Sequence, residues 1–264
     1  MPPLEYLYLY DDADAAGLDT DYLSYWLAHL LPDVQIGVRP DFLTFHLARF
    51  TDSERDALVD ALSAQLERAE VKNLVRPQDR EVLPPVEPEE RDLDIIYEAP
   101  ALQAILRLLI PEEERGPARV HVMFTSNYLG QWREDAAYLG LEAAALGVPN
   151  LISTSGLVEA LELPKRYHFM RQQLAVMGVE EDVEELFAEE TVGYGDPRLN
   201  EVCKGYLLQA LYFHLTGETG CDDPDCRLHI APTHVETVRT QVLGQPSLCE
   251  RHRALLVAWG GEPE

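Results

Sequence analysis

The chain has 264 residues, 46% of them hydrophobic, which is enough for one large domain or two small ones with a sizeable buried core. Its 47 acidic residues outnumber 21 basic ones, and a net charge of −26 repels phosphate backbones and argues against nucleic acid as a partner. The acidic excess is more typical of a proteome-wide composition bias than of one functional patch. No apolar run reaches the roughly 18 residues of a membrane span. The first residues lack a signal peptide's basic segment, so we expect a cytoplasmic protein.

Hydrophobic periodicity predicts strands and helices that alternate along the chain. The expected strands span 4–10, 34–38, 120–124 and 150–158, and the expected helices span 20–31, 51–73, 100–109, 134–146, 164–177 and 199–215. Thr51 or Ser53 could cap the second helix, and Gly217 stands where a left-handed C-cap would end the last one. This interleaving predicts an α/β or α+β fold with a mixed sheet.

Three stretches are expected to be irregular. The segment 76–94 combines four prolines with dense charge and is interpreted as an exposed loop or linker. The polar and aromatic segment Ser126–Trp132 follows a strand, and we interpret it as an ordered surface loop, with the lining of a binding groove as the alternative. Gly193 and Gly195 lack phosphate-loop spacing and indicate a turn.

The cysteines provide the clearest indication of a chemical role, which is metal binding. Cys221, Cys226, Cys249 and His252 follow the pattern C-x4-C-x22-C-x2-H. Two short-range pairs that are separated by a longer segment are typical of a structural zinc site, and three thiolates with one imidazole complete a tetrahedron without an open position. The pattern therefore predicts one structural zinc ion per chain, held by the segment 221–252.

Alternatives remain at this stage. His229 or His234 could replace His252 as the fourth ligand. A Cys221–Cys226 disulfide, or three unrelated buried thiols, would also fit the spacing. Cys203 lies inside the last predicted helix and is interpreted as a core residue.

The residues ALYFHLTGETGCDDPDCRL, followed by CERH, resemble the archaemetzincins, a branch of the metzincin zinc peptidases with the pattern HExxHxxGxxHC-x4-C-x-M and a later C-x-x-C. In this register His214 falls on the second catalytic histidine, Gly217 on the turn glycine and Leu228 on the Met-turn methionine. The two cysteine pairs of that family hold a structural zinc. The resemblance covers roughly 118–256, and it implies a metzincin-like single domain over 1–264 with a mixed sheet, packed helices and a zinc-stapled C-terminal segment.

The departures from the family pattern bear on function. The first catalytic histidine, the general-base glutamate and the third histidine correspond to Ala210, Leu211 and Gly220. A catalytic zinc of this type needs three protein ligands and a carboxylate, and His214 alone remains. The resemblance therefore implies a metallopeptidase-like protein without the catalytic site.

Three functions compete. The first is a non-catalytic binding or regulatory protein with a groove for a peptide or small ligand near His214, lined by Tyr212 and Trp132. The second is a metal-dependent hydrolase whose site is rebuilt from His214, His168 or Glu218. The third is a partner-binding protein in which zinc only stabilises the fold and the loop 76–94 is the interaction element. His121, in a predicted strand, is expected to face away from its neighbours Val120 and Val122.

Overall fold

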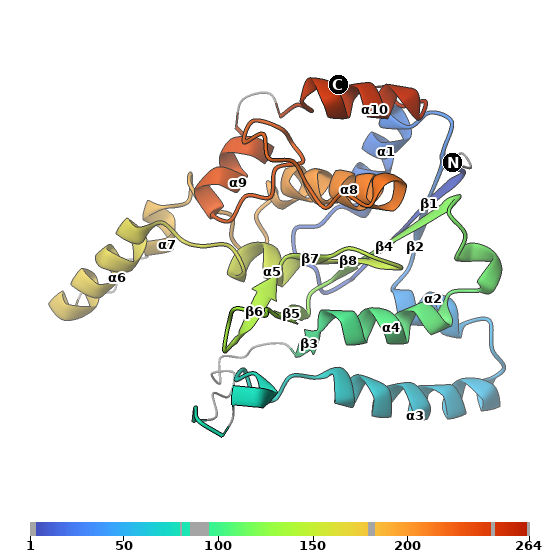
Figure 1. Ribbon diagram of the computed structural model, residues 1–264, viewed down its shortest axis with the longest axis horizontal. Helices are drawn as coiled ribbons and strands as arrows, with labels where there is room; N and C mark the ends of the chain where they lie inside the picture. Colours follow the sequence, from blue (N-terminus) through green and yellow to red (C-terminus); the bar gives the residue numbers. More distant parts are fainter. Residues whose placement is uncertain (1–3, 80, 85–94, 179–182, 244–245, 263–264) are drawn as a thin grey trace.

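The computed structural model describes residues 4–79, 81–84, 95–178, 183–243 and 246–262 (Figure 1). A five-stranded sheet has the order β2 (Gln35–Arg39), β1 (Tyr6–Tyr10), β4 (Arg119–Thr125), β8 (Asn150–Ser153) and β7 (Ala144–Ala145). The first four strands are parallel, and β7 runs antiparallel at the edge. A smaller sheet has the order β3 (Ile96–Glu98), β5 (Tyr128–Trp132) and β6 (Leu139–Glu142).

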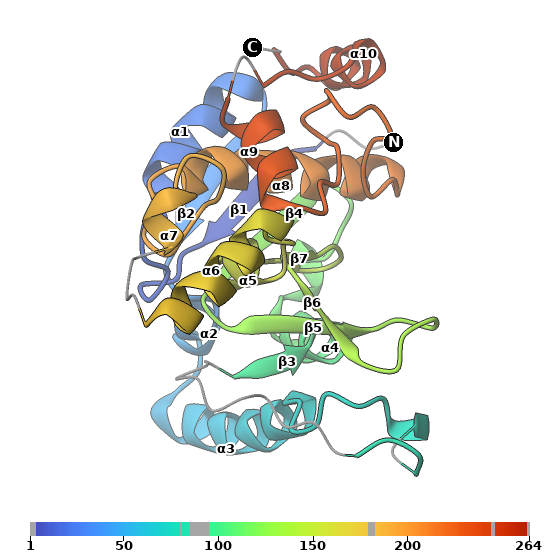
Figure 2. The ribbon, with the colours of Figure 1, turned by 90° about the vertical axis from the view of Figure 1, so that its left-hand side faces the viewer.

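Helices cover both faces of the larger sheet (Figures 1 and 2). On one face, α1 (Thr20–Leu30) and α8 (Leu199–Thr216) pack against the sheet, with α9 (His234–Gln241) and α10 (Glu250–Ala258) beyond them. On the other face lie α2 (Phe42–Leu47) and α4 (Ala99–Leu109), and α3 (Asp52–Ala69) packs on α4. The short α5 (Thr154–Glu159) follows β8, while α6 (Lys165–Met177) and α7 (Val183–Leu186) form an arm that projects from the body.

The alternation of side chains along the central strands divides the core in two. Leu7 and Leu9 of β1 face α1 and α8, together with Val120 and Val122 of β4, whereas Tyr10 faces α2 and α4. His121 lies on the face opposite Val120 and Val122, as predicted. The mixed α/β fold is confirmed. Among the described helices none is both long and apolar enough to cross a membrane.

Most predicted elements are present with small shifts of their ends, and the left-handed cap at Gly217 is confirmed by its φ of 78°. Glu54 accepts hydrogen bonds from the backbone N–H and hydroxyl of Thr51, which makes Thr51 the cap of α3. Cys203 is fully buried, as expected.

Two predictions were wrong. The segment 134–146 is not a helix but contains β6 and β7, because pairing with β5 and β8 overrides the helix propensity of its alanines and leucines. The segment Ser126–Trp132 contains β5 and is not a loop, since residues 128–130 pair with β3 and residues 129–132 with β6. The predicted strand 150–158 ends at Ser153, whose side chain caps α5. Much of the predicted loop 76–94 lies outside the described residues.

Gly156 allows α5 to approach the loop between β6 and β7 closely. A Cβ atom at this position would lie 2.4 Å from the Glu142 carbonyl oxygen and 3.0 Å from the Ala143 Cα. We expect Gly156→Ala to lower the free energy of unfolding by about 1–3 kcal/mol, because backbone atoms must move. Denaturant unfolding measures the change. Gly116→Ala is the matched control, since a Cβ there meets no atom within 4 Å; equal losses in both variants would contradict the explanation.

A buried polar cluster forms where β1, β2, α2 and β4 meet. The hydroxyl of Tyr10 lies 2.7 Å from Arg39 Nη1, 2.9 Å from His121 Nδ1 and 3.0 Å from His46 Nε2. Arg39 also forms a two-pronged ion pair with Glu114, with both contacts at 2.9 Å. Tyr10 and both histidines are at most 2% exposed.

The contacts determine which atoms carry protons in this cluster. His121 Nε2 lies 2.9 Å from the backbone carbonyl oxygen of Glu114, so it donates, and Nδ1 accepts the Tyr10 hydroxyl proton. The Tyr10 oxygen in turn accepts from Arg39 and from His46 Nε2. This pattern of donors and acceptors requires a neutral His121 ring, because a protonated ring would donate from both nitrogens. Burial lowers the pKa of His46 and of His121 to about 4, since a second cation beside Arg39 would be poorly solvated.

Candidate metal centre and cleft

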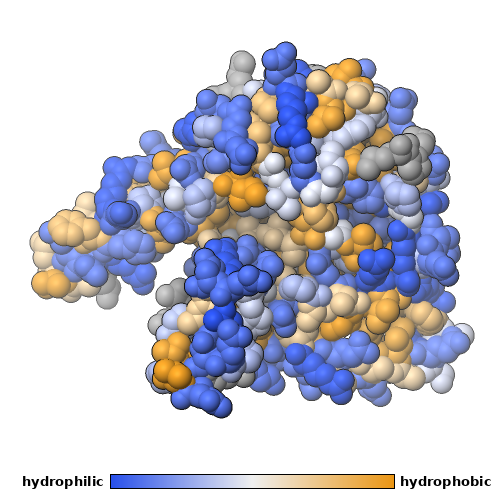
Figure 3. Space-filling view, viewed as in Figure 1, coloured by the Kyte–Doolittle hydropathy of each residue, from blue (hydrophilic) through white to orange (hydrophobic). Residues whose placement is uncertain are grey.

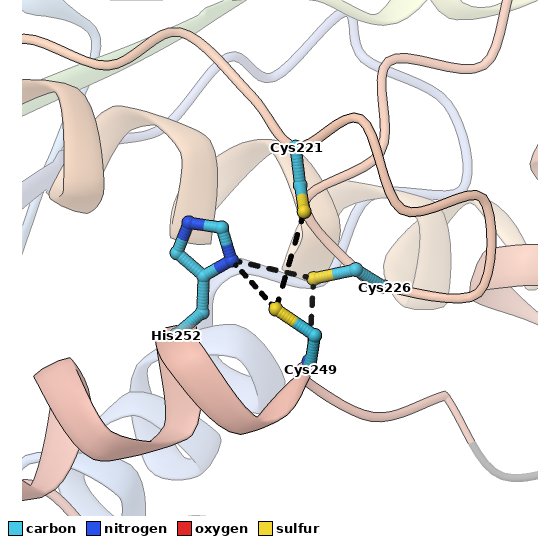
Figure 4. Close-up of side chains that lie close together, drawn as sticks. All are labelled: Cys221, Cys226, Cys249 and His252. Carbon is cyan, nitrogen blue, oxygen red and sulfur yellow. Dashed lines mark hydrogen bonds between the residues drawn. The ribbon is translucent and has the colours of Figure 1, made fainter.

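The backbone brings together the two ends of the predicted metal-binding segment. Two isolated parallel bridges join Cys221 to His229 and Cys226 to Ser247. They hold the loop after α8 against the segment that precedes α10. Cys249 is the N-cap of α10, so His252 lies in the first turn of that helix and on the same side. The four side chains Cys221, Cys226, Cys249 and His252 point toward one another (Figure 4).

The distances within this group fit a tetrahedral ion. All four candidate ligand atoms lie within 4.8 Å of one another. Cys221 Sγ is 4.0 Å from Cys249 Sγ, and His252 Nδ1 is 3.6 Å from Cys226 Sγ and 3.1 Å from Cys249 Sγ. Ordinary zinc bond lengths give edges of about 3.8 Å between sulfurs and about 3.6 Å between sulfur and nitrogen. This group could therefore hold a metal ion.

Surrounding groups orient the ligands. Backbone N–H groups of Asp223 and Cys249 donate to the sulfurs of Cys221 and Cys226, both at 3.4 Å. The second ring nitrogen of His252 is 3.9 Å from a carboxylate oxygen of Glu218, the type of outer partner that orients metal-bound histidines. The Tyr212 hydroxyl donates to the His252 backbone oxygen at 2.5 Å, which ties α8 to α10.

The electrostatics of the group favour a bound cation. Burial raises the pKa of the Cys226 thiol to about 12 and raises that of Cys221, while it lowers the pKa of His252. Closely packed thiols therefore keep their protons unless a cation compensates for their negative charge. All four cysteines of the chain are free, and no Cys221–Cys226 disulfide forms.

The other candidate ligands lie elsewhere. His229 Nδ1 lies 3.1 Å from the Cys221 backbone oxygen, and His234 Nε2 lies 2.9 Å from the Val158 backbone oxygen. His214 Nε2 is 2.8 Å from the Pro117 backbone oxygen, whereas His168 stands on the projecting α6. Among the described residues, one group of three or more histidines, cysteines and acids could hold a metal, and it is the Cys/His group.

A cleft of about 600 Å³ separates α8 from the edge strand β7. The molecule is hollowed near the centre of Figure 3, between the arm and the smaller sheet. Tyr206, Gln209 and Phe213 of α8 line one wall, and Ala144 and Ala145 of β7 line another. Thr219, Ile230, Arg133, Glu142 and Glu162 also border the cleft.

The structure places each of the α8 residues that the family pattern singles out. Ala210 and Leu211, which the resemblance placed at catalytic positions, are fully buried in the main core. Gly220 packs against Ile230, with its Cβ position 2.5 Å from that side chain. Tyr212 is 2% exposed against His252 and Trp259, so neither it nor His214 lines the cleft. The residues that do face the cleft, Gln209 and Phe213, were missed because periodicity does not determine a helix face to within one residue.

Comparisons with known proteins bear on the family. A model of the "Probable metallopeptidase family (DUF6775)" matches residues 4–259. The chain belongs to this family. The solved structures include a similar one, the crystal structure of archaemetzincin from Methanopyrus kandleri, with 15% sequence identity, a TM-score of 0.42 and coverage of 97% of this chain and 95% of that one. No curated protein matches the chain. The family match over residues 4–259 confirms the predicted resemblance to metallopeptidases.

Proposed function

We propose that this member of the metallopeptidase family is a zinc-stabilised, non-catalytic protein that binds a peptide or a small ligand in the cleft between α8 and β7. The observation that carries the proposal is the cleft-facing side of α8. Gln209 and Phe213 stand four residues apart on this side, and neither side chain is of a type that binds a catalytic zinc ion. Imidazole ligands that could replace them are missing from the described lining of the cleft.

The donor set supports a structural role for the metal. Three thiols and one imidazole provide a full tetrahedral shell, and soft sulfur ligands favour zinc over harder cations. Such a shell leaves no position for a reactive water. The ion would join the loop after α8 to the start of α10 and thereby stabilise the fold. Free thiols persist in a reducing compartment, so we also propose a cytoplasmic location.

The position of β7 at the edge of the larger sheet favours a peptide as the ligand. β7 is the last strand of its sheet, and its outer side borders the cleft. An extended peptide can add to such an edge through backbone hydrogen bonds, while pockets beside it accept alternate side chains. Phe213 and Tyr206 provide apolar surface, and the ion pair between Arg133 and Glu142, at 2.9 Å, provides a polar border.

The alternative function, a hydrolase with a metal site rebuilt around His214, has less support. The His214 imidazole is held by the Pro117 carbonyl group. Glu218 interacts with Arg251 and lies beside His252, and His168 lies on the arm. His168 therefore lies far from the end of α8, and His214 and Glu218, which flank that end, each interact with a different partner.

Peptide binding and turnover test the proposal together. We expect a fluorescein-labelled mixture of ten-residue peptides to bind the zinc-loaded protein, as measured by anisotropy, without cleavage of a quenched fluorogenic peptide mixture. Phe213→Arg should weaken binding about tenfold or more, because it places a charge in the apolar wall. Val176→Arg on α6, where the side chain is 89% exposed, is the matched control. Zinc-dependent cleavage would favour the hydrolase, and absence of any binding would favour a purely structural protein.

A further inference from the structure

The side of α8 that faces the cleft carries two polar groups, the amide of Gln209 and the hydroxyl of Tyr206. Gln209 is only 6% exposed, and Tyr206 is half-buried three residues before it, so the two are neighbours on the helix surface. Within the part of the chain that the structure describes, neither the amide nor the hydroxyl has a hydrogen-bond partner. Polar groups buried to this extent are nearly always paired, so these two point to a ligand in the cleft.

The surroundings of the two groups favour a neutral ligand group. The pKa of the Tyr206 hydroxyl is raised, first by burial and then by Cys203 and Glu142, so the hydroxyl stays neutral in surroundings of low polarity. Gln103, which also lines the cleft, already has a structural role, because its Nε2 donates to the backbone oxygens of Ala145 and Pro149 at 3.0 and 2.9 Å. Gln209 and Tyr206 are therefore the side chains of α8 that remain for polar contacts with a ligand.

The edge strand β7 provides backbone groups on another wall of the cleft. The Ser153 N–H donates to the Ala143 carbonyl oxygen at 2.8 Å, and Ala144 lies opposite Ile152 in the antiparallel pair. Bonded and non-bonded residue pairs alternate along such a ladder, so the N–H and C=O groups of Ala144 point away from β8. Because Ala144 lines the cleft, these groups can pair with one residue of an extended peptide.

We propose that Gln209 and Tyr206 recognise the side-chain carboxamide of an asparagine or glutamine in a peptide that lies along β7. This inference rests on the peptide-binding function proposed for the cleft.

The hydrogen-bonding capacity of Gln209 selects the carboxamide. An amide has an acceptor oxygen beside a donor nitrogen, so a ligand carboxamide can exchange two hydrogen bonds with Gln209 while the Tyr206 hydroxyl bonds to either atom. A carboxylate only accepts and would leave the Gln209 oxygen unpaired, and an ammonium group only donates and would leave its nitrogen unpaired. A trans peptide unit directs its N–H and C=O to opposite sides, so the ligand's own backbone cannot provide both bonds.

Matched peptide mixtures test the requirement for a carboxamide. Fluorescein-labelled ten-residue mixtures would carry glutamine or asparagine, methionine or leucine, or glutamate or aspartate at one central position, and no asparagine or glutamine elsewhere. We expect the carboxamide mixtures to bind the full zinc-loaded chain about tenfold more tightly than the other two kinds, as measured by anisotropy, because only a carboxamide pairs both atoms of Gln209. Equal binding of all mixtures would overturn this inference and leave peptide binding in place. No binding of any mixture would overturn the function proposed for the cleft as well.

Matched variants test the location. Gln209→Met keeps the length of the side chain but removes the amide, and it should reduce the preference for carboxamide mixtures to less than about twofold. Tyr206→Phe should reduce the preference severalfold. Gln172→Met, the same change at an exposed position on α6, should leave the preference unchanged. A preference that persists in Gln209→Met would place the carboxamide elsewhere and overturn the inference.

The melting temperature separates recognition from a structural role of the amide. Because the Gln209 amide has no hydrogen-bond partner in the described parts of the chain, Gln209→Met should not lower the melting temperature of the zinc-loaded protein. A decrease of more than about 5 °C would assign the amide to the fold and would contradict the proposal.

Discussion

Replacing Cys226 with serine is expected to remove the bound metal and to lower the melting temperature by on the order of 10 °C or more. Cys226 is fully buried, and its sulfur stands 3.6 Å from His252 Nδ1. A neutral hydroxyl is a much poorer zinc ligand than a thiolate, and the free energy of binding a structural zinc contributes directly to folding. Elemental mass spectrometry on untagged protein, purified under reducing conditions, gives the metal content, and calorimetry gives the melting temperature.

Three control variants separate this group from other metal-binding residues. His214→Ala and His229→Ala should both keep one zinc ion per chain, because these imidazoles contact the backbone oxygens of Pro117 and Cys221. Cys203→Ala should keep it as well, since this thiol lies in the main core. A metal ion lost with His214→Ala, or a second ion per chain, would contradict the proposed function and favour the rebuilt hydrolase site.

Acid is expected to destabilise the chain through the cluster around Tyr10. The pKa values of His46 and His121 are about 4 in the folded chain, below the value of about 6.5 of an exposed histidine. Between these values the unfolded chain binds more protons, so the stabilisation is complete above pH 6.5 and is lost as the pH falls toward 4. The loss amounts to about 3 kcal/mol of unfolding free energy for each histidine. Denaturant unfolding at several pH values measures it.

His46→Gln isolates this contribution from other acid effects, including release of the proposed zinc ion. The glutamine amide can still donate to Tyr10 but does not titrate. We expect the unfolding free energy of this variant to fall less steeply than that of the unmodified chain between pH 6.5 and pH 4. His168→Gln removes an exposed histidine on α6 and should leave the slope unchanged. Parallel curves for His46→Gln and the unmodified chain would show that the cluster is not the source of the pH dependence.

The group of three cysteines and one histidine that could hold a metal could be predicted from the sequence because its spacing is local. The pairs Cys221/Cys226 and Cys249/His252 each come from one turn of chain, and geometry needed only to bring the two turns together. Similarly, Gly217 marked the end of α8, because a left-handed cap is a local property.

The features that could not be predicted depend on contacts between segments that are far apart in the sequence. The helix predicted over 134–146 was wrong because this segment pairs with β5 and β8. These pairings outweigh the helix propensity of its own residues. The Tyr10 cluster had no sequence signal, since His46 and His121 lie 36 and 111 residues from Tyr10. The cleft-facing residues of α8 were missed by one position, because apolar residues occur all around this helix and leave its orientation undetermined.

The strand order also bears on the folding rate. β1 lies between β2 and β4, so Tyr6 pairs with Gln35 and with the far more distant Arg119. The next strand in the sheet, β8, begins only at Asn150. Parallel pairings across such separations require the closure of long loops before any contact compensates for the lost chain entropy. Refolding is therefore expected to be slow, and an N-terminal fragment that ends before β4 would leave one edge of its apolar β1 unpaired and prone to aggregation.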